Sequence, residues 1–260
     1  MAIIHLIQQG KGGVGKSMIG AILFQVLKAA GKEVHAYDTD PINATLAGYS
    51  EFNTTAIEIM RGSNIDKAKF DILWEQHVMK LPPQAHAIVD NGASSFVALS
   101  AYLETSDAFN ILEKEGHTVD LHTVITGGQA IQDTLKGFGI ICKYFSEVPK
   151  VVWLNPFFGD VTLAGKQFED FELYQDNSDQ VAALIKLPTV DDSALSQNLE
   201  ELFARRHSFE AGINSPSLGI MSRSRLKKHW NVLFDLISQA PFIVGASSSF
   251  TVSDEMDDTE

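Results

Sequence analysis

IIHLIQQGKGGVGKS, at residues 3–17, is the stretch that decides the fold of this 260-residue chain. Its first residues are mostly apolar, and the glycine-rich segment after them fits the pattern GxxxxGKS from Gly10 to Ser17. The next segment, up to Gly31, has the composition of a helix that ends at a glycine. A strand, this loop and a helix in succession predict a phosphate-binding P-loop, with a plain glycine-rich turn as the alternative.

The loop has the residue types that a nucleotide phosphate requires. Backbone N–H groups can close around an anion only where no Cβ blocks them, and the start of a helix adds partial positive charge. Lys16 is expected to reach the β- and γ-phosphates, and the hydroxyl of Ser17 to bind Mg²⁺. The residues expected to bind the nucleotide here are Gly10, Lys11, Gly12, Gly13, Val14, Gly15, Lys16, Ser17 and Met18.

Acidic residues follow two further predicted strands. Asp38 and Asp40 come after one of them and Asp90 after the other. Open parallel sheets bind ligands at the carboxyl ends of their strands, so these acids are expected to bind Mg²⁺ through water or to orient the attacking water. We take Asp38 and Asp90 as metal ligands together with Ser17. The alternatives are an Asp-Pro turn with exposed acids and, for Asp90, a helix N-cap.

The rest of the chain alternates between predicted strands and helices. Strands are expected near residues 33–37, 85–89, 119–126, 151–154 and 182–187, and helices near residues 64–80, 94–103, 129–145, 196–206 and 223–239. This βα alternation predicts an α/β fold with a doubly wound, mainly parallel sheet. We expect one domain over residues 1–240 and an acidic, disordered tail over residues 241–260.

Composition narrows the classes of protein that the chain can belong to. A net charge of −13 argues against a surface that coats nucleic acid broadly. Cys142 is the single cysteine, so no disulfide is expected within the chain, and the eight histidines have no metal-ligand spacing. There is no basic leader with a cleavage site and no apolar run of about 20 residues, so we expect a cytoplasmic protein.

Basic residues gather in the last two predicted helices. For this group, which we call the basic cluster, DNA is a candidate partner and a solvated helix face is the alternative. Its members are Arg205, Arg206, Arg223, Arg225, Lys227 and Lys228.

Lys11, directly after the first glycine, makes KGGVGKS resemble the deviant Walker A box of the ParA/MinD family of ATPases, which have the SIMIBI type of P-loop fold. The resemblance implies ATP and Mg²⁺ as ligands and a homodimer in which Lys11 reaches the partner's nucleotide. It implies that Asp40 positions the attacking water, that Asn155 recognises the adenine edge and that the loop at Pro188 closes over the base. Lys11, Lys16 and Asp40 are thus the expected catalytic residues. A solvated loop lysine and a plain turn at Asn155 are the alternatives.

Five segments together are similar to the TraL proteins of conjugative plasmids, which are relatives of the plasmid-stability protein StbB. They are QGKGGVGKS, DTDPINAT, IVDNGASSF, TVITGGQA and VVWLNPFFG. The resemblance implies an ATPase that supports plasmid transfer or maintenance, together with a plasmid-encoded partner protein. Turnover is expected to be slow without that partner, because no arginine is an obvious finger in cis. The acidic tail does not resemble the basic membrane anchor of MinD, so no membrane anchor is expected.

Three other functions fit the same loop. An ATP-binding switch or adaptor would recruit a plasmid or secretion partner without hydrolysis. An iron–sulfur reductase needs paired cysteines, and the single Cys142 argues against it. A small-molecule kinase or synthetase would bind a metabolite near the acidic segments.

Overall fold

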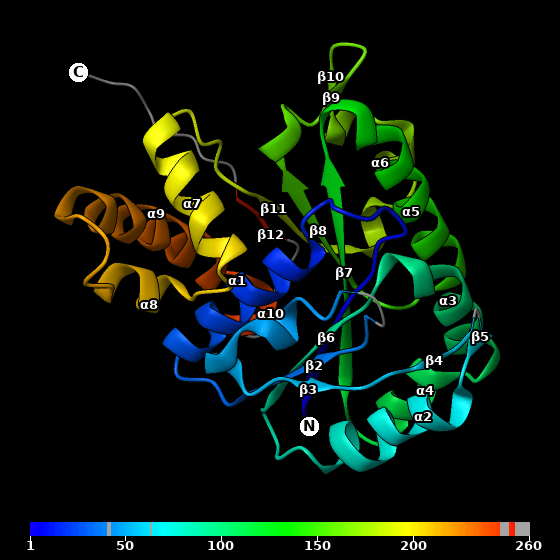
Figure 1. Ribbon diagram of the computed structural model, residues 1–260. Coiled ribbons are helices and arrows are strands. Elements are labelled where there is room, and N and C mark those ends of the chain that lie inside the picture. Colours follow the sequence, from blue (N-terminus) through cyan, green and yellow to red (C-terminus); the bar gives the residue numbers. More distant parts are fainter. Residues whose placement is uncertain (41–42, 63, 245–249, 253–260) are drawn as a thin grey trace.

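Buried apolar strands form the centre of the molecule in a computed structural model that describes residues 1–40, 43–62, 64–244 and 250–252 (Figure 1). The described strands of the central sheet are all parallel, in the order β12-β11-β8-β7-β1-β6-β2-β3. They are β1 (Ile3–Ile7), β2 (Val34–Asp38), β3 (Thr55–Ala56), β6 (His86–Asp90), β7 (Thr118–Thr126), β8 (Lys150–Asn155), β11 (Val181–Lys186) and β12 (Phe250–Val252). Two short antiparallel pairs lie apart from it: β4 (Met60–Arg61) with β5 (Asn64–Ile65), and β9 (Thr162–Leu163) with β10 (Lys166–Gln167).

Helices cover both faces of this sheet, with α7 and α9 on one side and α3 and α5 on the other (Figure 1). Each face buries its own apolar residues, which is the doubly wound arrangement that the alternation predicts. The helices are α1 (Lys16–Ala29), α2 (Lys67–Ile72), α3 (Phe96–Thr105), α4 (Ala108–Lys114), α5 (Ile131–Tyr144), α6 (Glu172–Gln175), α7 (Ser193–Ala204), α8 (Phe209–Asn214), α9 (Ile220–Ser238) and α10 (Pro241–Val244). None of the helices in the described part of the chain is long and apolar enough to cross a membrane.

The helix predicted over residues 64–80 differs from the one observed. The first two residues form β5, and Asp66 then caps α2, since its Oδ1 accepts a hydrogen bond from the backbone N–H of Lys69 at 3.4 Å. After α2 the chain continues as a π-helical turn over Leu73–His77. The prediction of one regular helix was therefore wrong at its start, because the Asp66 side chain favours an N-cap over a helix interior.

The fold continues past residue 240, where we had placed the end of the domain. Phe242 and Ile243 of α10 are each 8% exposed and pack in the core on the α1 face of the sheet. Farther along, β12 pairs with β11, with Phe250 beside Ala183. Residues 241–244 therefore belong to the domain, because their apolar side chains pack in its core. The remainder of the predicted disordered tail, at residues 245–249 and 253–260, lies outside the described residues.

A row of buried aromatic nitrogens crosses β8, β7, β1 and β6 beneath α10. Trp153 Nε1 donates to His122 Nδ1 at 3.0 Å, His122 Nε2 lies 2.9 Å from His5 Nδ1, and His5 Nε2 lies 2.9 Å from His86 Nδ1. An indole nitrogen can only donate, so the row has one direction and each neutral histidine carries its proton on Nε2. Burial lowers the pKa of His86 to about 4 and that of His122 to about 3. We call these four residues the histidine row.

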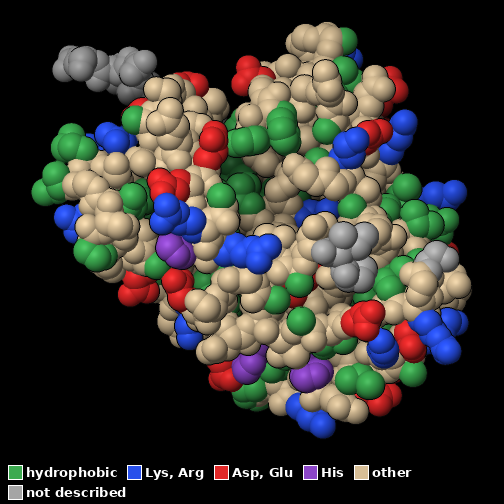
Figure 2. Space-filling view, viewed as in Figure 1, with side chains coloured by type: hydrophobic (Ala, Val, Ile, Leu, Met, Phe, Trp, Pro, Cys, Tyr) green, Lys and Arg blue, Asp and Glu red, His purple; other side chains and the backbone are tan. Residues whose placement is uncertain are grey.

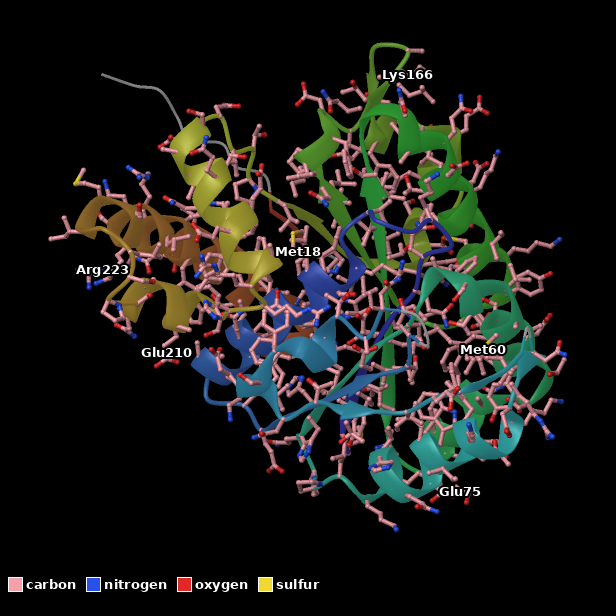
Figure 3. All side chains as sticks on the ribbon, viewed as in Figure 1. Met18, Met60, Glu75, Lys166, Glu210 and Arg223 are labelled. Carbon is pink, nitrogen blue, oxygen red and sulfur yellow. The ribbon has the colours of Figure 1, made fainter. Side chains whose placement is uncertain are left out.

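Half of the basic cluster is engaged within the fold. Arg205 forms an ion pair of 2.7 Å with Glu201, one turn earlier on α7. The Arg225 guanidinium donates from Nε to Asn198 Oδ1 at 3.3 Å, and the Arg206 side chain lies against Gly48. Arg223 lies on the far side of the helical layer from Met18 (Figure 3). The structure therefore gives Arg205, Arg206 and Arg225 local contacts that do not require a nucleic acid.

The single thiol of the chain lies inside the protein. Cys142 of α5 is 3% exposed, and burial raises its pKa to about 11, with Lys150 acting in the opposite direction. Its surroundings are the apolar residues of the core between α5 and the sheet. Cys142 is thus a core residue, as the apolar sequence around it indicates.

Candidate nucleotide-binding site

The predicted P-loop joins β1 to α1 at the carboxyl edge of the sheet. Gly13 has a φ of +75° and Gly15, the N-cap of α1, has a φ of +103°. Side chains with a Cβ rarely adopt these conformations, so the two glycines let the loop turn back over the first turn of α1. That turn carries Lys16, Ser17 and Met18, which places the expected nucleotide-binding residues of the loop and the helix together.

Lys16 occupies the inside of the loop. It is 8% exposed, and its ammonium donates to the backbone carbonyl oxygen of Lys11 at 3.2 Å. Burial lowers the pKa of Lys16, while the charges of Asp90 and Asp40 act in the opposite direction. A buried ammonium between a loop of amides and two carboxylates is suited to hold phosphate oxygens.

Asp90, at the end of β6, is the least satisfied charged group of the site. It is 1% exposed, and among the described residues neither carboxylate oxygen accepts a well-formed hydrogen bond, although the Ser17 hydroxyl lies near enough to interact with it. Burial raises its pKa to about 7, with the Ser17 side chain acting in the opposite direction. Buried polar atoms without partners are uncommon, and a hydrated Mg²⁺ beside Ser17 would supply what these oxygens lack. The N-cap alternative is not seen, because α3 begins at Phe96 without a side-chain cap.

Asp38 has a different role from the one expected of a metal ligand. Its Oδ1 accepts from the backbone N–H of Asp40 at 3.0 Å and its Oδ2 from that of Ala47 at 2.9 Å. Burial raises its pKa, and the hydrogen bonds from Ala47 and Asp40 act in the opposite direction. Both oxygens thus shape the segment after β2, which leaves Asp38 as an outer partner of any metal.

Asp40 and the segment after β6 lie in close contact. A Cβ on Gly92 would come within 2.7 Å of Asp40 Cγ, so only glycine permits this approach. Next to this contact Thr39 Oγ1 donates to Asn91 Oδ1 at 2.5 Å and to the Asp90 carbonyl oxygen at 3.0 Å. The two acidic segments are therefore tied to each other beside Lys16. Sequence reasoning missed Thr39 and Asn91, although each is adjacent to a predicted acid, while Pro41 of the first segment lies outside the described residues.

A metal at this edge would depend on the nucleotide for most of its ligands. No group of three or more His, Cys, Asp or Glu in the described ranges has the geometry to hold a metal ion. Mg²⁺ commonly binds through one or two protein ligands together with waters and phosphate oxygens. Ser17 and Asp90 fit that smaller set.

Lys11 contacts its own chain in this structure. Its ammonium lies 2.9 Å from Oδ2 of Asp133, which is in the first turn of α5. Both side chains are about half exposed, at 43% and 47%, and ion pairs in that environment contribute little to stability. The ion pair with Asp133 thus holds the Lys11 side chain against its own chain, and breaking it would cost little free energy.

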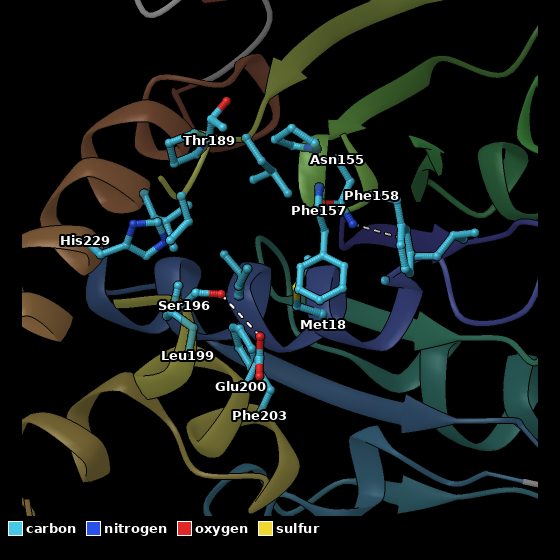
Figure 4. Close-up of a pocket in the computed structure, with 18 of the residues that line it drawn as sticks. Met18, Asn155, Phe157, Phe158, Thr189, Ser196, Leu199, Glu200, Phe203 and His229 are labelled. Carbon is cyan, nitrogen blue, oxygen red and sulfur yellow. Dashed lines mark hydrogen bonds between the residues drawn. The ribbon is translucent and has the colours of Figure 1, made fainter. Parts of the chain in front are cut away.

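A cavity of about 450 Å³ opens beside the loop, between the first turn of α1, the ends of β8 and β11, and the helices α7 and α9 (Figure 4). Figure 2 shows hydrophobic side chains within the hollow of this face. Asn155 and Pro188, the residues expected at the base, both line the cavity. However, Asn155 Nδ2 donates to the carbonyl oxygen of Val14 at 3.0 Å, and its Oδ1 accepts from the backbone N–H of Phe157 at 3.2 Å.

Several lining residues were not found from the sequence. Phe157 follows the Asn-Pro turn that ends β8, and Leu199 and Phe203 come from α7. The two consecutive aromatic residues directly after a strand end were a usable signal for Phe157. The α7 residues have no motif, because only the tertiary fold brings them to the loop.

The site and the sheet identify the class of protein as a P-loop nucleotide-binding domain. A model of the CobQ/CobB/MinD/ParA nucleotide-binding domain matches residues 5–228, and the chain belongs to this family. Two proteins of Escherichia coli named Protein TraL are 39% and 40% identical to it over 241 residues, which are 92% of this chain and 99% of each relative.

Solved structures similar to this chain include MinD from Aquifex aeolicus. The two sequences are 13% identical, the match covers 89% of this chain and 97% of the MinD chain, and the TM-score is 0.48. A plasmid partition protein from Borrelia burgdorferi bound to AMPPNP is 17% identical, covers 90% of this chain and 98% of its own, and has a TM-score of 0.47.

Proposed function

We propose that the protein binds ATP with Mg²⁺ and hydrolyses it as a nucleotide-dependent homodimer that supports conjugative transfer or maintenance of a plasmid. The observation that carries this proposal is the buried Asp90 carboxylate, which lies beside Ser17 and Lys16 and accepts no well-formed hydrogen bond among the described residues. The loop amides and Lys16 bind the phosphates, while Ser17 and Asp90 hold the metal. The similarity to the two TraL proteins supports the biological setting.

In this proposal the chain acts mainly by positioning and by neutralising charge. Mg²⁺, when bound, neutralises charge that develops on the phosphate oxygens. Asp40, held over Gly92 and near Lys16, orients the attacking water. Lys11 leaves Asp133 and reaches the nucleotide of the second copy. A cytoplasmic location is part of the proposal and accords with the free thiol of Cys142.

The test of hydrolysis is phosphate release by purified protein with Mg·ATP, comparing wild type with Lys16→Ala, Asp40→Ala and the control Lys28→Ala. Lys28 lies in the last turn of the same helix as Lys16, away from the loop. We expect the first two variants to fall to about a tenth of the wild-type rate or less and the control to match wild type. Wild-type rates in Asp40→Ala or Lys16→Ala would refute the roles given to them.

The test of the homodimer is molar mass in solution with ATP, with ADP and without nucleotide. We expect ATP to produce a dimer that Lys11→Ala weakens, because the lysine would no longer reach the partner's phosphates. The control is Asp133→Asn, which frees Lys11 from its contact with α5 and should not weaken the dimer. A dimer that survives Lys11→Ala unchanged would contradict the role of Lys11 in trans.

A switch that binds ATP without hydrolysing it is the second candidate. Single-turnover phosphate release separates the two functions, because a switch retains bound ATP over many hours whereas an ATPase releases phosphate.

A further inference from the structure

The cavity is directly adjacent to the P-loop, whose residues form part of its wall. Gly13, Val14 and Gly15 line it together with Met18 of the first helical turn, so one set of residues faces both the loop and the cavity. A nucleotide whose phosphates bind the loop must place its nucleoside next to that loop. A volume of about 450 Å³ lies within the range of small-molecule sites.

The ring of Phe157 forms one wall of this cavity. In Figure 4 it lies beside Met18, across the cavity from Leu199 and Phe203. The side chain is 63% exposed, although aromatic rings are usually buried. Phe158 packs edge-on against it, with ring centroids 4.9 Å apart and planes at 87°. An aromatic face opposite the apolar side chains of Leu199 and Phe203 makes a slot suited to a planar ligand.

Asn155 is engaged in holding that wall. Its amide group bonds to the loop through the Val14 carbonyl and to the backbone N–H of Phe157 through Oδ1. A Cβ on Gly15 would come within 2.8 Å of Asn155 Nδ2, so the glycine permits this close contact. These two hydrogen bonds anchor the Asn155 amide to the P-loop on one side and to Phe157 on the other.

We propose that the Phe157 ring stacks on the base of the bound nucleotide and that Asn155 is a positioning residue that holds this ring relative to the P-loop. This inference rests on the proposed function, since it takes the phosphates to lie in the loop. Stacking uses the face of the base, which every nucleobase has. The loss of the ring therefore weakens adenine and guanine nucleotides alike.

The experiment measures the affinity of the full-length protein for ATP, GTP and inorganic tripolyphosphate, each with Mg²⁺, by calorimetry. We expect Phe157→Ala to weaken ATP and GTP by about tenfold to a hundredfold, the range that stacking provides, and to change tripolyphosphate by less than about twofold. Phe157→Tyr should retain affinity and Phe157→Leu should not, because only the first keeps an aromatic face. Leu163→Ala, an exposed apolar change on β9 outside the cavity, is the matched control.

Asn155→Ala separates positioning from recognition. If Asn155 acts through Phe157, its removal weakens ATP and GTP equally, and the double variant with Phe157→Ala loses little more than either single variant. A loss that is larger for ATP than for GTP and adds to that of Phe157→Ala would overturn the positioning role.

Two further outcomes are decisive. Wild-type ATP affinity in Phe157→Ala, or equal wild-type affinities for ATP and tripolyphosphate, would overturn the stacking proposal while the phosphate site stands. Wild-type protein that binds neither ligand would overturn the proposed function, and the stacking proposal with it. Loss of both ligands in Lys16→Ala supports the phosphate site on which the inference rests.

Discussion

Two groups of buried polar atoms lie on the same sheet, and they differ in whether the chain satisfies them. In the histidine row each residue donates a hydrogen bond to the next one, from Trp153 to His122, then to His5 and then to His86. At the end of β6 the two oxygens of Asp90 accept no well-formed hydrogen bond in the described part of the chain. Polar atoms that are paired internally hold a structure together, whereas a buried carboxylate that lacks such bonds is suited to an external partner such as a metal ion.

The largest effect is expected from breaking the histidine row. His122→Phe removes both an acceptor for the Trp153 indole and the partner of His5 Nδ1, which leaves two buried polar atoms without partners. We expect the free energy of unfolding to fall by about 2–5 kcal/mol, measured by urea denaturation. Nucleotide affinity of the folded protein should not change. His35→Ala, which removes an exposed histidine, is the control, and equal stabilities of the two variants would contradict a structural role for the row.

Asp90→Asn should have the opposite effect, with stability retained and activity reduced. The variant replaces a buried carboxylate that accepts no well-formed hydrogen bond, so the nucleotide-free protein should be at least as stable as wild type. The rate of phosphate release with Mg·ATP should fall by about 10- to 100-fold, because the metal would lose the carboxylate that holds it beside Ser17. An unfolded or strongly destabilised Asp90→Asn protein would show that Asp90 is structural, and the contrast with the histidine row would disappear.

The two groups should also oppose each other as the pH changes. The pKa of each histidine in the row is lowered from 6.5 by burial. Above pH 6.5 these histidines are neutral in both the folded and the unfolded protein, so their contribution to stability is complete. Below pH 6.5 only the unfolded protein takes up their protons, and the free energy of unfolding falls by up to about 1.4 kcal/mol per pH unit for each histidine. Asp90 and Asp120, each with a pKa raised from 3.8 to about 7 by burial, contribute in the other direction, since their stabilisation is lost as the pH rises through 7.

Urea denaturation at pH 7, 6 and 5 measures this balance. We expect wild type to lose stability toward pH 5 and His122→Phe to lose less, because it has fewer buried imidazoles to protonate on unfolding. Parallel curves for the two proteins would show that the row does not titrate on unfolding.

The smallest effect is a proton released when Mg·ATP binds. With a pKa of about 7, Asp90 is about half protonated at pH 7, and a metal beside it would keep it ionised. Calorimetry in two buffers of different ionisation enthalpy should then detect roughly half a proton more for wild type than for Asp90→Asn at pH 7. Equal proton release from the two proteins would mean that Asp90 is ionised before the metal arrives.

Local patterns predicted the parts of the molecule that depend on neighbours in sequence. The P-loop, the strand before it and Asp90 at a strand end follow from glycine positions and apolar runs, and the structure and the family match confirm the fold. The histidine row was not predicted from the sequence, because its residues do not have the spacing of metal ligands and come together only through the register of four strands. Phe157 and the engagement of Asn155 escaped for a related reason, since both depend on how the loop after β8 packs against the P-loop.

Cys142 has a practical consequence for measuring motion in this protein. Its thiol is buried and has a raised pKa, so alkylating dyes and spin labels react with it slowly. A cysteine introduced at Val97, which is 72% exposed on α3, would then be the fast-reacting thiol of an otherwise natural chain. One probe per copy can therefore be attached through this single substitution, with Cys142 left in place, and spectroscopic distances between labelled copies would report how they associate.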